Sequence, residues 1–158
     1  LGAAHRVLFW QTFQHKADGL LYWGVNHWPQ FAARTMDPIP AAKRWPNVPW
    51  EDGGRNGDGY FIYPHPDGPL TGLRLEIMRD GVEDYDALRL LQNLLKENLD
   101  RLPDALVGRA RNALDIGENI SASLTNYPQT VEALLARRRT VNELIVEISH
   151  ATTAPLRP

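Results

Sequence analysis

The pattern of apolar positions divides the chain into an irregular, aromatic front half and a regular, helical back half. In the front half, Val7, Trp10 and Phe13 recur at helical spacing, which predicts a helix from Arg6 to His15. After a turn, the mostly apolar run from Leu20 to Val25 predicts a buried strand. The front half also holds all five tryptophans of the chain, so any aromatic site is expected there.

A long loop follows the first predicted strand, from His27 to Gly59. Prolines at positions 38, 40, 46 and 49 exclude regular structure over most of it, and long loops of this kind are often functional. A second strand is predicted at Tyr60–Tyr63, ended by Pro64 and Pro66. Because strands alternate with helices, the two strands are expected to be parallel and joined by a crossover.

The back half predicts three helices and a frayed tail from Ala151 to Pro158. Thr71 is the expected cap of the first helix, and Gly81 predicts a bend or a break in it. The second helix begins near Pro103 and the third near Pro128. The apolar positions of the three predicted helices are, in chain order, Val82, Tyr85, Leu88, Leu91, Leu95, Leu106, Ala110, Leu114, Val131, Leu134, Leu135, Val141, Leu144, Ile145 and Ile148.

Composition narrows the function classes. The 158 residues carry a formal net charge of -2, so no basic excess points to nucleic acid or to an anionic membrane. No apolar run reaches the roughly 18 residues that span a bilayer. With no cysteine, disulfides, thiolate nucleophiles and zinc–thiolate sites are excluded. The histidines show no metal-binding spacing, and no metal or cofactor is expected.

Two parallel strands cannot bury both of their faces without neighbours. The chain is also shorter than the roughly 250 residues of a complete eight-stranded α/β barrel, and its first residue is Leu1. We therefore expect it to be part of a larger sheet or barrel, with any targeting signal lying upstream.

Several short motifs occur in a characteristic order over about the first 95 residues. Together they resemble the catalytic domain of glycoside hydrolase family 123, whereas the last third resembles that family only in being helical. The motifs are Phe9-Trp10-Gln11, Asp18-Gly19-Leu20-Leu21-Tyr22-Trp23, Gly57-Asp58-Gly59, Tyr63-Pro64, Leu73-Arg74-Leu75-Glu76 and Arg79-Asp80-Gly81-Val82-Glu83-Asp84-Tyr85.

The resemblance implies an α/β fold, the C-terminal portion of a (β/α)8 barrel followed by a helical extension. It places the last barrel strands and helices at 1–97, packed C-terminal helices at 98–150 and the tail at 151–158. The implied activity is that of a retaining exo-β-N-acetylgalactosaminidase with substrate-assisted catalysis, an exception to the two-carboxylate scheme. Its partners would be a carbohydrate substrate and the remainder of the barrel, and a secreted or periplasmic location is implied.

In that family an adjacent Asp-Glu pair orients the substrate acetamide and protonates the leaving group. No Asp-Glu dipeptide occurs in this sequence, and Glu51-Asp52 and Glu83-Asp84 have the reverse order. No catalytic residue is therefore assigned to the chain. A carbohydrate-binding or scaffold domain without catalysis is the alternative interpretation.

The candidate sugar-binding residues lie at and beyond the ends of the two predicted strands, where barrels place their sites. Flat aromatic rings pack on the apolar faces of sugars, and an amide both donates and accepts hydrogen bonds. These residues are Trp23, Asn26, Trp28, Tyr63 and His65. Alternatively, the tryptophans belong to a core, Tyr63 anchors a turn and His65 is merely exposed.

For three other groups of residues, a structural role is considered beside a functional one. Trp45 and Trp50 either cap the pocket or pin the long loop. The basic run Arg137–Arg139 is expected on a solvated helix face. One charged cluster pairs opposite charges three or four residues apart, which predicts a brace between the helix and the barrel instead of an acid catalyst. It comprises Arg74, Glu76, Arg79, Asp80, Glu83, Asp84 and Asp86.

Overall fold

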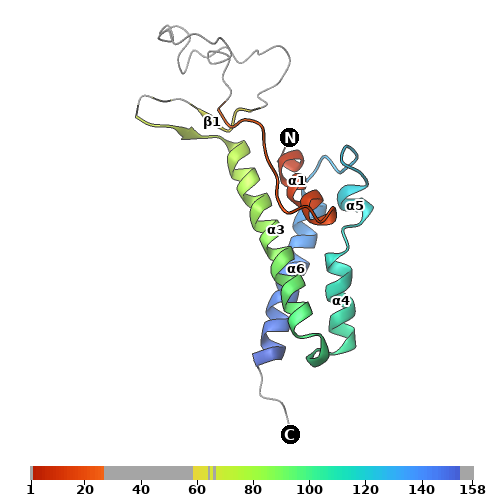
Figure 1. The fold of residues 1–158 in the computed structure, drawn as a ribbon. Helices are drawn as coiled ribbons and strands as arrows, with labels where there is room; N and C mark the ends of the chain where they lie inside the picture. The colour runs from red at the N-terminus through yellow and green to blue at the C-terminus, as the bar shows by residue number, and fades with distance from the viewer. Residues whose placement is uncertain (1, 27–58, 64, 66, 154–158) are drawn as a thin grey trace. The chain divides into compact units, whose positions relative to one another are not determined.

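The computed structural model describes residues 2–26, 59–63, 65 and 67–153. The chain separates into a helical unit, formed by residues 1–20 and 78–158, and a smaller unit of residues 21–77 that holds the strands. The helices are α1 (Gly2–Gln14), α3 (Leu73–Glu97), α4 (Asp104–Leu114), α5 (Glu118–Ser121) and α6 (Glu132–Thr153), with a 3-10 turn η2 (Leu99–Arg101) after α3 (Figure 1).

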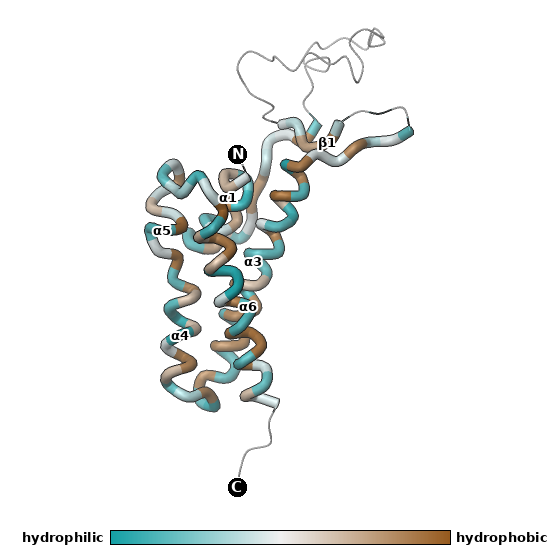
Figure 2. Tube along the Cα trace, turned by 180° about the vertical axis from the view of Figure 1, so that it is seen from behind, coloured by the Kyte–Doolittle hydropathy of each residue, from teal (hydrophilic) through white to brown (hydrophobic). Residues whose placement is uncertain are grey.

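The helical unit is organised around one apolar core. Apolar positions recur along α3, α4 and α6 among polar ones, as the brown patches in Figure 2 show. The core residues recur three or four positions apart along the helices, as Leu88, Leu91 and Leu95 do on α3. Trp10 of α1 is fully buried in the same core. The helices predicted from Arg6, Pro103 and Pro128 are thereby confirmed, although α6 begins only at Glu132.

Of the bend or break predicted at Gly81, the break is wrong, because α3 runs unbroken from Leu73 to Glu97. Gly81 is buried against α1, and a Cβ there would overlap the ring of Phe9 and lie 3.2 Å from the carbonyl oxygen of Arg6. The glycine therefore permits close packing of α1 on α3, and this packing outweighs its low helix propensity.

Two helix ends also differ from the ends predicted from the sequence. Thr71 does not cap α3, since it lies in strand β2 (Leu70–Thr71), and the Gly72 carbonyl accepts the first-turn N–H of Leu75 at 2.9 Å. At the other end, α6 continues through Ala151–Thr153, part of the segment predicted to be frayed. The remaining positions of that segment, 154–158, lie outside the described residues.

The smaller unit contains one two-stranded antiparallel sheet. Strand β1 (Ile62–Tyr63) pairs with β2, with Ile62 opposite Thr71 and Tyr63 opposite Leu70. Asn26 forms an isolated antiparallel bridge with Tyr60. The strand predicted at Tyr60–Tyr63 is thus confirmed in part, while the expected parallel arrangement is wrong for the strands described.

The strand predicted from Leu20 to Val25 does not form. Its end is hydrogen-bonded to the second predicted strand through the carbonyl oxygen of Val25, and Leu21 is 91% exposed. A strand needs a ladder of partners along its length, which the described residues do not supply here. The described chain is a mostly helical protein with a small sheet, and the barrel arrangement stays a prediction.

Candidate functional site

Two of the predicted site segments meet in the smaller unit although they lie far apart in sequence. The carbonyl oxygen of Val25 accepts the backbone N–H groups of Phe61 and Ile62, at 2.8 Å and 3.1 Å. The next residue, Asn26, bridges to Tyr60. The end of the Trp23–Asn26 segment is therefore held beside the segment that leads to Tyr63.

Aromatic packing anchors this junction. The rings of Tyr22 and Phe61 meet edge to face, with centroids 4.8 Å apart and an interplanar angle of 84°. Phe61 and Tyr60 are buried, whereas Trp23 is 51% exposed and Asn26 is exposed. Tyr22 and Phe61 thus fix the backbone, and their neighbours Trp23 and Asn26 present an aromatic surface and an amide at the surface of this unit.

Tyr63 is held from two sides. A Cβ on Gly72 would lie 2.6 Å from Cε2 of Tyr63, so the tyrosine ring packs directly on the glycine. Nη1 of Arg74 donates a long hydrogen bond of 3.4 Å to the Tyr63 hydroxyl. Arg74, predicted as part of the charged brace, is half-buried and contacts the candidate site residue Tyr63. Its position two residues beyond a glycine gave no sequence signal for that role.

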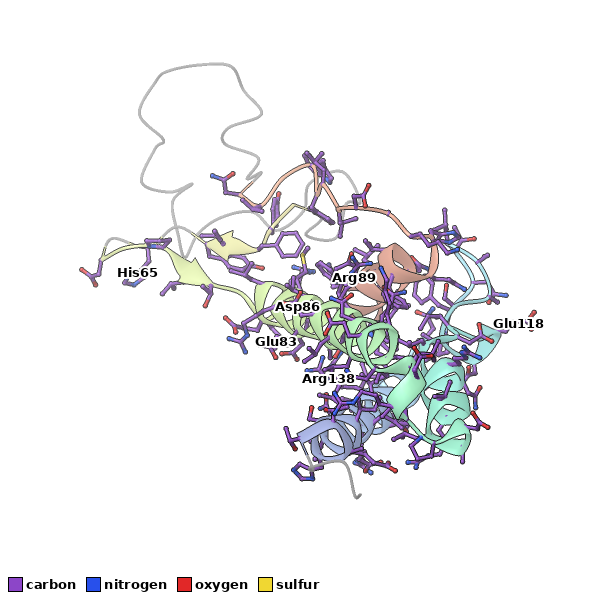
Figure 3. The ribbon with its side chains drawn as sticks, turned by 60° about the horizontal axis from the view of Figure 1, so that its bottom comes forward. His65, Glu83, Asp86, Arg89, Glu118 and Arg138 are labelled. Atoms are coloured by element: carbon purple, nitrogen blue, oxygen red, sulfur yellow. The ribbon has the colours of Figure 1, made fainter. Side chains whose placement is uncertain are left out.

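His65, which is labelled in Figure 3, takes part in a local turn between β1 and β2. Its Nδ1 accepts the backbone N–H of Asp67 at 3.2 Å and lies 3.7 Å from the Asp67 carboxylate. This geometry is that of an Asx-like turn contact. The predicted ligand Trp28, and the loop residues Trp45 and Trp50, lie outside the described residues.

The charged cluster of α3 is centred on Asp84, whose side chain is 1% exposed. Nε and Nη2 of Arg6 donate to its two oxygens at 2.6 Å and 2.8 Å, and Nε1 of Trp10 donates at 2.8 Å. Nη1 of Arg138 donates from α6 at 3.1 Å. The hydrogen bond to Asp84 is the largest cause of a raised pKa for Arg6.

We refer to Arg6, Trp10, Asp84 and Arg138 as the Asp84 brace. The carboxylate is sealed from solvent and occupied by N–H donors, so it has no open face for a substrate. Asp84 therefore has a structural role and joins α1 and α6 to α3, while the brace between the charged cluster and a barrel stays a prediction. The prediction of a solvated Arg137–Arg139 run is wrong for Arg138, and also for Arg137, which donates to the carbonyl oxygens of Asn112, Ala113 and Asp115 at the end of α4.

A comparison with protein families decides the identity of the chain. Residues 2–91 match the family model described as glycoside hydrolase 123, catalytic domain. The chain belongs to glycoside hydrolase family 123. The family match covers α1, the smaller unit and α3 as far as Leu91, so the Asp84 brace ties family 123 residues to Arg138 beyond the match. No curated protein and no solved structure matches the chain.

The described residues of this family 123 chain contain no group of three or more His, Cys, Asp or Glu side chains suited to a metal ion. Among the helices of that same part of the chain, none is long and apolar enough to cross a membrane. Membership in a glycoside hydrolase family makes a carbohydrate the substrate class.

Proposed function

We propose that this chain forms one wall of the sugar pocket of a retaining exo-β-N-acetylgalactosaminidase. The observation that carries the proposal is the junction of Val25 with Phe61 and Ile62, within the part of the chain matched to family 123. This junction brings together the Trp23–Asn26 segment and the segment that leads to Tyr63, which both carry side chains suited to binding a sugar. Trp23, Asn26, Trp28, Tyr63 and His65 are the residues proposed to line this wall.

The proposed residues differ in what they offer a sugar. The exposed ring of Trp23 provides a flat surface for the C–H face of a pyranose. The Asn26 amide supplies a donor and an acceptor for hydroxyl groups. Tyr63, packed on Gly72 and bonded to Arg74, offers a phenol whose position is already fixed. Fixed groups bind better because less conformational entropy is lost on binding.

In the proposed reaction the acetamido oxygen of the substrate attacks its own anomeric carbon and expels the leaving group. An acidic pair must orient that acetamide and protonate the leaving oxygen. No Asp-Glu dipeptide occurs in this sequence, and the buried Asp84 is fully engaged. We therefore place the acid pair on a segment outside these residues.

The exposure pattern of residues 21–25 supports a larger assembly. Leu21, Trp23 and Val25 are 91%, 51% and 42% exposed, while the intervening Tyr22 packs on Phe61. Such alternation is typical of a strand with one covered face, and here the open face is apolar as well. We propose that another part of the catalytic domain covers Leu21 and Val25 on this face, and that the ring of Trp23 stays open to the sugar.

The test is hydrolysis of 4-nitrophenyl β-N-acetylgalactosaminide by the natural polypeptide, combined with determination of its N-terminal sequence. We expect release of 4-nitrophenol and an Asp-Glu pair after an apolar strand. A natural polypeptide with no such pair and no hydrolysis would remove the glycosidase proposal.

The absence of an Asp-Glu pair favours one alternative, a carbohydrate-binding or scaffold domain without catalysis. It predicts that N-acetylgalactosamine changes the tryptophan fluorescence of the protein in a saturable way, without turnover of any glycoside. Saturable binding together with hydrolysis would exclude this alternative.

A further inference from the structure

An open groove of about 500 Å³ lies between α3 and α6 in the helical unit. Its apolar lining comes from Ala87 and Leu90 of α3 and from Ile145 and Val146 of α6, and its polar lining from Glu83, Asp86, Arg138 and Asn142. Figure 3 labels Glu83 and Asp86 on α3 and Arg138 on α6. No aromatic residue lines this groove, so it lacks the stacking surface expected of a sugar subsite.

Two stripes of exposed side chains flank the groove. On α3, Val82, Asp86 and Leu90 recur every four residues, and both apolar members are nearly half exposed, at 43% and 47%. The α3 stripe therefore presents a negative charge between two apolar side chains.

The stripe on α6 has the opposite charge. Leu135, Arg139, Asn142 and Val146 lie on one side of that helix by their spacing, and Leu135 and Val146 are 45% and 53% exposed. The α6 stripe thus presents a positive charge between two apolar side chains.

The charges at the centres of the two stripes have no partner among the described residues. The side chains of Asp86 and Arg139 form no hydrogen bond or ion pair there, and both residues are exposed. This sets them apart from their neighbours: Glu83 lies 3.7 Å from Arg79, and Arg138 is bound to Asp84. A surface that pairs apolar side chains with unmatched charges of both signs is complementary to itself.

We propose that the α3/α6 face binds a second copy of this chain about a two-fold axis. In a two-fold interface each contact occurs twice, so the α3 stripe of each copy meets the α6 stripe of the other. Asp86 then pairs with Arg139 of the second copy, and Val82 and Leu90 cover Leu135 and Val146. Burial of the apolar members supplies affinity, and the two charge pairs fix the register.

The experiment is light scattering on the purified protein over a range of concentrations. We expect a concentration-dependent species of twice the mass of one polypeptide. Asp86→Arg and Arg139→Asp each place like charges opposite one another twice, and each should weaken dimerisation about tenfold or more. The double variant carrying both substitutions restores opposite charges and should recover most of the loss.

Arg111→Asp is the matched control, because it reverses an exposed arginine on α4, away from both stripes. It should leave dimerisation unchanged, and circular dichroism should show that all variants keep the helical content of the wild type. A monomer at every concentration would overturn the proposal. So would a dimer that neither single reversal weakens, or a double variant no better than the single ones.

Discussion

Arg6 and Asp84 lie 78 positions apart in sequence and are joined by two charge-assisted hydrogen bonds, of 2.6 Å and 2.8 Å. Two-point contact between a guanidinium and a carboxylate fixes both distance and orientation. It thereby sets how α1 lies against α3, and Arg138 extends the same contact to α6. The arrangement of the helical unit depends on one buried carboxylate.

Asp84→Ala should therefore be strongly destabilising. It leaves the partly buried guanidinium groups of Arg6 and Arg138 without their carboxylate, at a cost of about 3–5 kcal/mol in the free energy of unfolding. Urea unfolding measures the loss. Glu97→Ala is the control on the same helix, because Glu97 is exposed and lies outside the α3 stripe, and it should change the unfolding free energy by less than about 0.5 kcal/mol. Equal costs for the two variants would contradict the brace.

The contribution of Arg6 should not depend on pH in the neutral to basic range. The hydrogen bond to Asp84 raises the pKa of Arg6 above that of a free arginine, so the stability it provides is fully present below the ordinary arginine pKa and is lost only as pH rises beyond the raised pKa. The destabilisation caused by Arg6→Ala should therefore be constant from about pH 7 to about pH 10. A cost that falls steadily over this range would show that Arg6 acts through a different titrating group.

Gly81 and Gly108 provide a matched pair of helical glycines. An alanine Cβ at position 81 would overlap the Phe9 ring, whereas at position 108 it would meet nothing within 4 Å. Gly81→Ala should lower the unfolding free energy by about 1–3 kcal/mol, because α1 must move away from α3. Gly108→Ala should raise it by about 0.5–1 kcal/mol, since alanine is the better helix former. Thermal unfolding of both variants measures the difference, and the same sign of effect in both would be inconsistent with this packing.

Substituting Trp23 and Trp10 in turn distinguishes a tryptophan on the surface from one in the core. Trp23 is 51% exposed, while Trp10 is fully buried and bonded to Asp84. Trp10→Ala should cost about 3–5 kcal/mol in unfolding free energy. Trp23→Ala should cost far less, yet should raise KM for the aryl glycoside in the natural polypeptide. If Trp23→Ala unfolds the protein as Trp10→Ala does, Trp23 is a core residue and not part of a pocket wall.

The sequence predicted the helices better than the strands, for a physical reason. A helix satisfies its backbone within one segment, so the spacing of Leu88, Leu91 and Leu95 suffices to predict its buried face. A strand depends on partners elsewhere, and the apolar run from Leu20 to Val25 does not form the strand that its apolar residues predicted.

Two of the residues that sequence reasoning misplaced, Arg74 and Arg138, share a cause. Arg74 was assigned to the charged brace of one helix and Arg138 to a solvated helix face, and both instead reach side chains on other segments, Tyr63 and Asp84. Long, flexible arginine side chains can span such distances while the pattern around them still resembles a solvated face. Spacing along one helix contains no information about these contacts.

The most direct test of the proposed pocket wall is kcat/KM for hydrolysis of the aryl β-N-acetylgalactosaminide by the natural polypeptide carrying Asn26→Ala. Asn26 is exposed next to the junction, and losing its hydrogen bonds to the sugar should lower kcat/KM by about tenfold to a hundredfold with the fold retained. Asn112→Ala, an exposed position on α4, should leave the value unchanged. An Asn26→Ala enzyme that is folded and as active as the wild type would contradict the assignment of this wall to the sugar pocket.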